Sequence, residues 1–191
     1  MNFKQYLLQE NIKATLVSER LAPPVDQDGE GQIPEFIDTH TELATNYKGY
    51  DIYLSHYFKI GPSLCLFDNN KKCIAFITFN YTNKQLYGDR KTTITYKEEE
   101  YKQLTRMWVH EDYRGKGLND ILHLAGLYNL DLTILTDDEV SPDGYKYYQK
   151  FFTKYPNIKK IYYNEKMDKF FEEEPIGLWK VPNFWRILFS K

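Results

Sequence analysis

One short stretch of the chain constrains its fold more than any other. It is a polar turn between a segment rich in β-forming side chains, residues 101–109, and a segment with apolar side chains at helical spacing, residues 121–128. The turn contains Gly115-Lys116-Gly117. Two glycines let consecutive backbone N–H groups converge at the N-terminus of a helix, where the helix dipole is positive. The stretch therefore predicts a strand, a pyrophosphate-binding turn and a helix, in that order.

The positive charge of this turn is local. Arg114 stands at its mouth and Lys116 lies within it, whereas the whole chain has 25 Lys and Arg residues against 27 Asp and Glu residues. A net charge of −2 provides no general attraction to a polyanion. We therefore expect no nucleic-acid partner, and we expect any bound polyphosphate to be held by the turn itself.

The first 34 residues divide into two parts. Residues 1–21 have apolar side chains at helical spacing and predict an amphipathic helix or pair of helices, and residues 22–34 form a linker with three prolines and two glycines. We accordingly divide the chain into an N-terminal segment, residues 1–34, and a main domain, residues 35–191. A short helix is predicted over residues 35–47.

The remaining sequence predicts an α/β fold. Alternating or β-rich runs predict strands, and an apolar-periodic run that opens at Ser141-Pro142 predicts a second helix. Strands come first, and the chain then alternates strand, helix, strand, helix and strand, which predicts a sheet with helices on its faces. The predicted strands are residues 50–55, 63–67, 73–79, 92–96, 101–109, 130–135, 158–163, 177–181 and 184–189.

Composition narrows the class of protein further. Aromatic residues make up 17% of the chain, which argues against disorder and for a well-filled core. The sequence has no apolar run long enough for a membrane span and no secretory signal, so we expect a cytoplasmic protein without a membrane partner.

Cys65 and Cys73 are its two cysteines, and no histidine nearby completes a zinc pattern. We predict no metal, and a reduced buried pair rather than a disulfide across a hairpin.

The turn resembles the acyl-CoA motif of the Gcn5-related N-acetyltransferase (GNAT) family. Val109, Tyr113, Arg114 and Gly117 match that motif, while Asn119 stands where the family has Gly or Ala. Asn can still offer its amide and cap a helix. The resemblance covers roughly residues 48–191.

The resemblance implies a fold and a donor substrate. The fold is a mixed, mostly antiparallel central sheet flanked by helices, to which this chain adds an N-terminal helical extension. The donor is acetyl-CoA, whose pyrophosphate is gripped by backbone amides and whose pantetheine arm pairs with the free edge of the strand before the turn. The implied acetyl-CoA-binding residues are Met107, Val109, Arg114, Gly115, Lys116, Gly117, Leu118 and Asn119.

A second match to the family lies in the next predicted helix. Ser141, Gly144, Tyr148 and Lys150 have the spacing of the family pattern Asn-x-x-Ala-x-x-x-Tyr-x-Lys, with Ser in place of Asn and Gly in place of Ala. Tyr148 aligns with the residue that protonates the departing CoA thiolate in many members. Because aromatic side chains surround it in the sequence, packing in the core is an equally good interpretation of Tyr148.

The base that deprotonates the acceptor amine is a choice among several acidic residues. Our candidate is Glu100, acting directly or through water, and its alternatives are Glu98, Glu99 and Glu111. A run of charges is also typical of a solvated surface. His123 lies within an apolar helix, which favours a histidine satisfied in the core over a catalytic one.

The acceptor itself is an unknown amine, on a small molecule or a protein. The family forms its acceptor wall from two helices between the first two strands, whereas residues 58–62 alone separate two predicted strands here. The wall is absent or is supplied by residues 1–47.

The alternative function is a catalytically inactive GNAT-fold binding protein or phage virion protein that contacts a protein partner through residues 1–47. The composition suits an AT-rich phage or bacterial genome, and a phage protein would lie in the host cytoplasm or the virion.

Overall fold

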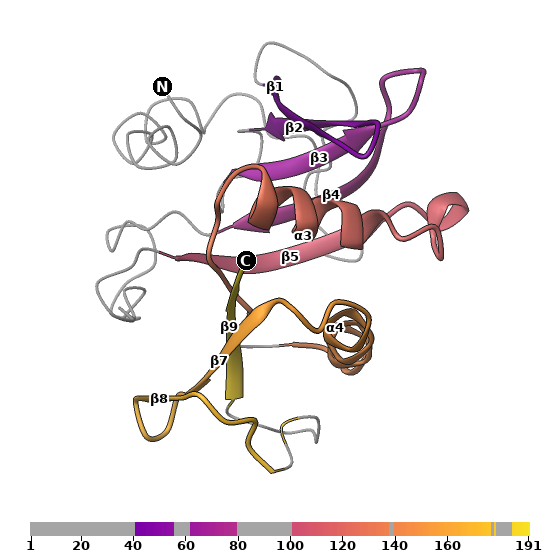
Figure 1. Cartoon of the computed structure of the whole chain (residues 1–191). Coiled ribbons are helices and arrows are strands. Elements are labelled where there is room, and N and C mark those ends of the chain that lie inside the picture. The colour runs from indigo at the N-terminus through magenta and orange to yellow at the C-terminus, as the bar shows by residue number, and fades with distance from the viewer. Residues whose placement is uncertain (1–40, 56–61, 80–100, 138–139, 177, 179–184) are drawn as a thin grey trace, which may run out of the picture.

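A computed structural model describes residues 41–55, 62–79, 101–137, 140–176, 178 and 185–191. These residues form an α/β fold with a large, mostly antiparallel sheet and two α-helices, which agrees with the predicted class (Figure 1). The amphipathic helix and linker predicted over residues 1–34 lie outside the described residues. So do the strand predicted over residues 92–96 and the candidate base Glu100.

The sheet has nine strands in the order β1-β2-β3-β4-β5-β6-β9-β7-β8. All neighbouring strands are antiparallel except β5 and β6, which are parallel. The strands are β1 (Thr41–Tyr47), β2 (Tyr50–Ser55), β3 (Ser63–Phe67), β4 (Cys73–Phe79), β5 (Lys102–Val109), β6 (Ile134–Leu135), β7 (Lys159–Asn164), β8 (Lys169–Phe171) and β9 (Trp185–Ser190).

The helix predicted over residues 35–47 is wrong for the part that the structure describes. Thr41–Tyr47 is strand β1, which pairs with β2 through a two-residue turn. Lys48 and Gly49 in that turn both have positive φ angles, 50° and 83°, as in the type I′ turns that suit the twist of a β-hairpin. Pairing with β2 and the β-branched side chains of Thr41 and Thr45 favour a strand here.

The hairpin of β3 and β4 is confirmed. Its turn is held by the carboxylate of Asp68, which accepts hydrogen bonds from the backbone N–H groups of Asn70 and Lys72, both at 2.9 Å. Cys65 and Cys73 are buried on these strands and both are free thiols. The prediction of a reduced pair is therefore confirmed.

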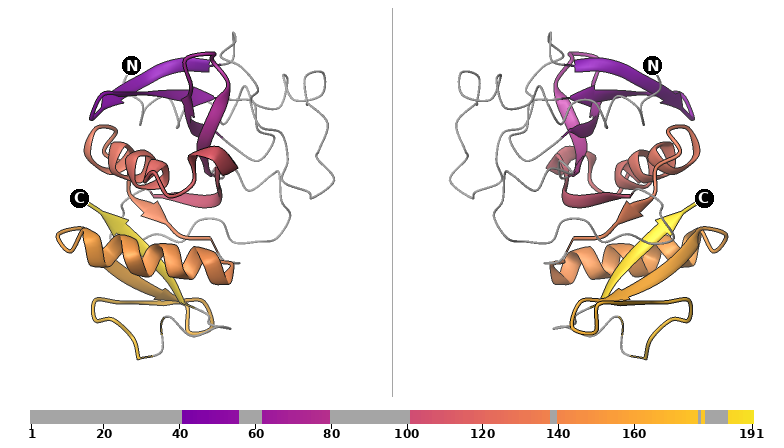
Figure 2. Two further views of the ribbon diagram at one scale, coloured as in Figure 1. Left: turned by 90° about the vertical axis from the view of Figure 1, so that its right-hand side faces the viewer. Right: turned by 90° about the vertical axis from the view of Figure 1, so that its left-hand side faces the viewer.

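The helices predicted after the glycine turn and after Ser141 are both present. Helix α3 (Leu118–Tyr128) covers the half of the sheet formed by β1 to β5, and helix α4 (Pro142–Lys154) lies beside β7 and β9 (Figures 1 and 2). Helix α4 begins at Ser141, whose hydroxyl accepts a hydrogen bond from the N–H group of Gly144. Its side chains Tyr148 and Phe152 pack against Phe189 of β9. These contacts join α4 to the second half of the sheet.

One predicted strand is shorter than expected, and one observed strand was not predicted. The strand predicted over residues 130–135 is reduced to Ile134–Leu135, because the N–H groups of Leu130 and Leu132 bond instead to carbonyl groups at the end of α3, Ala125 O and Gly126 O. These bonds cap the helix and use up donors that a longer strand would need. Strand β8 was not predicted, and it is a three-residue strand at the edge of the sheet that pairs with β7.

Strands β5 and β6 pair over a short distance and then part. Lys102 and Gln103 of β5 pair with Ile134 and Leu135 of β6, whereas residues 104–109 continue beside β4. The register between β4 and β5 shifts at Thr105, which indicates a β-bulge where β5 leaves β6. Beyond that point, none of the described strands pairs with β5 on the side that faces α4.

Candidate functional site

A cleft of about 810 Å³ lies where β5 and β6 part. One wall is the outer part of β5, and the opposite wall is α4 together with the chain that leads from β6 into it. The turn after β5 and the first residues of α3 close one end. The cleft thus joins the outer part of β5 to the N-terminus of α3.

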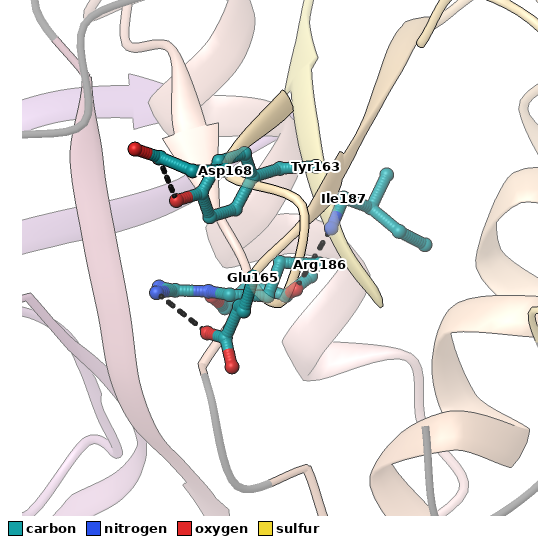
Figure 3. A network of polar contacts seen from close by, with 6 residues as sticks. Tyr163, Glu165, Asp168, Arg186 and Ile187 are labelled. Carbon is teal, nitrogen blue, oxygen red and sulfur yellow. Dashed lines mark hydrogen bonds and ion pairs between the residues drawn. The ribbon is translucent and has the colours of Figure 1, made fainter. Parts of the chain in front are cut away.

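A buried arginine holds the chain at the end of β6. Arg186 is 5% exposed, and its Nε and Nη2 donate to the carbonyl oxygen of Thr136 at 2.9 and 2.7 Å. Thr136 also exchanges hydrogen bonds with Ile187 of β9, at 3.0 Å in both directions. Arg186 lies beside Glu165 (Figure 3), and the distance between Nη1 of Arg186 and Oε1 of Glu165 is 3.4 Å. These bonds tie the chain to β9, so it does not follow β5.

The turn after β5 has the backbone expected for an anion site. Gly115 and Gly117 have φ angles of 77° and 75°, and a Cβ atom added at either glycine would meet no atom within 4 Å. Gly117 is the N-cap of α3, and none of the described side chains caps that end. The first N–H groups of an α-helix have no acceptor within the helix. They are therefore available to a ligand in the cleft.

Most of the residues implied as acetyl-CoA-binding line this cleft. They are Met107, Val109, Arg114, Gly115, Gly117, Leu118 and Asn119, and the candidate acid Tyr148 lines it too. Lys116 does not, because its side chain lies against the ring of Tyr113, with Nζ 4.6 Å from the ring centroid. The side chain of Arg114 is held at the cleft by a 3.2 Å hydrogen bond from Nε to Val109 O.

Two lysines of α4 supply cations that the sequence motif around the turn does not contain. Lys150 and Lys154 both line the cleft. Lys154 Nζ lies 2.7 Å from the carboxylate of Asp120 in the first turn of α3, and Tyr155 donates to the same carboxylate at 3.2 Å. This cluster joins the C-terminal end of α4 to the first turn of α3. Lys154 and Asp120 are 34 residues apart, and no local sequence signal links them.

The hydroxyl group of Tyr148 is buried in the cleft without a partner among the described residues. The side chain is 2% exposed, and its hydroxyl oxygen has no hydrogen bond there. Burial, followed by the negative charge of Asp137, raises the pKa of Tyr148 well above its usual value. The phenol is therefore protonated at neutral pH. A buried hydroxyl that lacks a partner is unfavourable, so this group is suited to a ligand atom.

His123 lies in the core, as the sequence predicts, but it is only partly satisfied, because its buried Nε2 has no hydrogen-bond partner among the described residues. It is fully buried between α3 and α4, and its Nδ1 lies 2.8 Å from Asn119 O. A carbonyl oxygen only accepts, so Nδ1 carries the proton. The hydroxyl of Tyr147 lies 3.1 Å from the same nitrogen. Burial lowers the pKa of His123 to about 4, which keeps the imidazole neutral at neutral pH.

Neither known protein families nor the described side chains add a further group to this site. No protein-family model matches the chain, and no curated protein matches its sequence. Within the ranges that the structure describes, no cluster of three or more His, Cys, Asp or Glu residues could hold a metal ion. None of the described helices is long and apolar enough to cross a membrane. The geometry of the cleft is thus the basis for a functional proposal.

Proposed function

We propose that this protein is an N-acyltransferase that moves an acetyl group from acetyl-CoA to an amine by direct attack. The observation that carries the proposal is the buried hydroxyl of Tyr148, which has no hydrogen-bond partner among the described residues. It lies in a cleft that joins the outer part of β5 to the N-terminus of α3. A thioester beside that hydroxyl would have its leaving group next to a proton donor. The resemblance of the turn to the GNAT motif supports the same function.

The cleft has features that suit each part of acetyl-CoA. The backbone amides at Gly117 and Leu118 suit the pyrophosphate, and Arg114 adds a charged donor beside them. The outer part of β5 suits the pantetheine arm, because an extended chain can add to an exposed strand edge through backbone hydrogen bonds. Met107 and Val109 lie on that edge.

The proposed chemistry requires one proton donor and one proton acceptor. The amine forms a C–N bond to the carbonyl carbon of the thioester while backbone N–H groups near Val109 polarise the carbonyl oxygen. The C–S bond breaks, and the thiolate takes a proton from Tyr148. From the sequence, Glu100 or a water molecule takes the proton of the acceptor. No covalent enzyme intermediate forms.

Thermal unfolding with acetyl-CoA tests the donor site. A ligand that binds only the native state stabilises it by about 2.7 kcal/mol at about 100 times its Kd, so the melting temperature should rise with concentration. ADP is the control, because it has the pyrophosphate but no pantetheine arm, and it should stabilise less at equal concentration. The release of free thiol from acetyl-CoA with a panel of amines then measures turnover.

The possible results separate the two functions. No thermal shift at millimolar acetyl-CoA would reject the proposal. Binding of acetyl-CoA without turnover of any amine would favour the inactive binding protein instead. Equal stabilisation by ADP and acetyl-CoA would indicate a site for phosphate groups alone, without use of the β5 edge.

A further inference from the structure

We propose that Met107 and Val140 limit the length of the acyl group that the cleft accepts, so that an acetyl ester of CoA fits and butyryl or longer esters do not. This inference rests on the proposed function. It names the class of donor by acyl length and assigns the selection to two side chains that meet across the cleft.

The two ends of α4 lie at different parts of the cleft. Near its C-terminal end, Lys154 Nζ lies 2.7 Å from the carboxylate of Asp120 in the first turn of α3, next to the proposed site of the phosphate groups. Tyr148, the proposed proton donor to sulfur, is closer to the N-terminus of α4 by roughly 9 Å along the helix axis at 1.5 Å per residue. A donor that extends from the phosphate groups to Tyr148 therefore directs its acyl group toward the N-terminal end of α4.

Gly144 lies where that acyl group would arrive. It precedes Tyr148 by one turn on the same face of α4, and it is buried at the cleft. Long side chains of a helix lean toward its N-terminus, so the side chain of Tyr148 covers the turn that contains Gly144. Because Gly144 has no side chain, the space beside its Cα atom is left to its neighbours.

Two apolar side chains occupy the space beside Gly144. A Cβ atom added to Gly144 would lie 2.8 Å from Cγ1 of Val140 and 3.6 Å from Cε of Met107. Met107 belongs to β5, whereas Val140 belongs to the chain that leads into α4, so side chains of the two opposite walls meet here. Both also pack against the hydrophobic core. A longer acyl chain would have to displace one of them.

The N-terminal cap of α4 holds the wall at Val140 in place. The hydroxyl of Ser141, the N-cap, accepts a hydrogen bond from the N–H group of Gly144 at 3.2 Å, and its carbonyl oxygen accepts one from the N–H group of Tyr145 at 2.9 Å. Both bonds fix the backbone directly after Val140. A fixed wall can select by length, because one methylene group too many in an apolar pocket lowers affinity by about 10- to 200-fold.

Isothermal calorimetry on the full chain with acetyl-, butyryl- and hexanoyl-CoA tests the inference. The nucleotide and the pantetheine arm are the same in all three esters, so only the acyl group changes, and binding is measured without an acceptor. The quantity compared is the ratio of the Kd for butyryl-CoA to the Kd for acetyl-CoA. We expect this ratio to be at least about 10 in the wild type and larger still for hexanoyl-CoA.

Met107→Ala and Val140→Ala should each lower the ratio by at least about fivefold, because each removes a side chain that stands in the way of the longer acyl group. Met167→Ala is the matched control. Met167 is 60% exposed, lies between β7 and β8, and is not among the residues that line the cleft. Its ratio should equal that of the wild type. Thermal unfolding checks that each variant is folded.

A double variant tests the contact between Val140 and Gly144 itself. In Val140→Ala the space beside Gly144 is open, and the methyl group that Gly144→Ala adds would lie 2.8 Å from the position that Cγ1 of Val140 held. The double variant V140A/G144A should therefore regain the wild-type preference for acetyl-CoA. Alanine is also more favourable than glycine within a helix, so the second change should not unfold α4.

Three results would overturn the inference. One is wild-type protein that binds butyryl-CoA as tightly as acetyl-CoA. Another is a ratio that changes in neither Met107→Ala nor Val140→Ala, or changes as much in Met167→Ala. The last is a double variant that binds butyryl-CoA as well as Val140→Ala does. Failure to bind any of the three CoA esters would instead reject the proposed function itself.

Discussion

The hydroxyl group of Tyr148 should affect stability and activity in opposite directions. Because it is buried without a partner in the described part of the chain, Tyr148→Phe should raise the free energy of unfolding of the ligand-free protein by about 1 kcal/mol. Loss of the proton donor should at the same time lower kcat by roughly 10²- to 10⁴-fold. Urea unfolding and thiol release measure the two effects.

A second buried tyrosine is a matched control. Tyr162 is 3% exposed, but its hydroxyl donates to Glu174 at 3.2 Å, and it lies outside the cleft. Tyr162→Phe should lower the free energy of unfolding by about 1 kcal/mol and leave acetyl-CoA binding unchanged. If Tyr148→Phe were also destabilising and left kcat unchanged, Tyr148 would be a packing residue.

His123 should make the protein less stable in mild acid. Its pKa in the folded protein is about 4, below the ordinary value of 6.5, so the unfolded chain binds more protons between these values. Stability is full above the unfolded pKa and is lost as the pH falls toward the folded pKa. The free energy of unfolding should fall by about 2 kcal/mol between about pH 7 and about pH 5 through this group alone.

Urea unfolding at the two pH values, on the wild type and on His123→Leu, checks this effect. The variant keeps an apolar side chain of similar size but cannot take up a proton. We expect it to lose most of the fall in stability between the two pH values. An unchanged pH dependence in the variant would assign the effect to other groups.

At the scale of elements, the turn between β5 and α3 depends on glycine for its backbone angles and on open space for its ligand. Gly117→Asp should raise the Kd for acetyl-CoA by roughly 100-fold, because like charges brought together cost several kcal/mol. Gly117→Asn has nearly the same shape, tolerates a positive φ angle and carries no charge. Its Kd should rise by much less than that of Gly117→Asp.

Isothermal calorimetry measures the Kd for acetyl-CoA of both variants, and thermal unfolding checks that they are folded. An acidic side chain is favourable at a helix N-terminus, so neither variant should unfold for reasons of charge. Equal loss of acetyl-CoA binding in the two variants would mean that the backbone change, and not phosphate repulsion, is responsible.

Elements whose signals are local were predictable, and those that depend on distant partners were not. Helix α4 follows from Ser141-Pro142 and its apolar face, all within 14 residues of the chain. Strand β1 was predicted as part of a helix on a weak helical pattern. It is a strand because its pairing with β2 outweighs that pattern. Strand β6 is short because the end of α3 uses the donors of Leu130 and Leu132.

At the scale of the whole molecule, acetyl-CoA should connect the two halves of the sheet. β5 and β6 pair through two residues each, and no other described strand pairs with residues 104–109 of β5 on the side of the cleft. Bound acetyl-CoA should slow hydrogen exchange in residues 104–109 and 118–120 by at least about tenfold at times before global unfolding. Mass spectrometry of peptides from these segments measures the change.

The control for this measurement is β8, which is also an edge strand but lies outside the cleft. Its exchange should change much less than that of β5 at early times. Equal protection of β5 and β8 would indicate general stabilisation, and protection of residues 118–120 alone would indicate that only the phosphate groups bind.

The sequence alone determined the strand, turn and helix around Gly115 and Gly117, because these elements depend on backbone angles and apolar spacing within a few residues. It also identified Tyr148 as a candidate but could not separate catalysis from packing. Only the tertiary structure decided that the hydroxyl of Tyr148 lies in the cleft without a described partner. The parting of β5 and β6 depends on Arg186 bonding to Thr136 across 50 residues, and such long-range pairing leaves no periodic signal in the sequence.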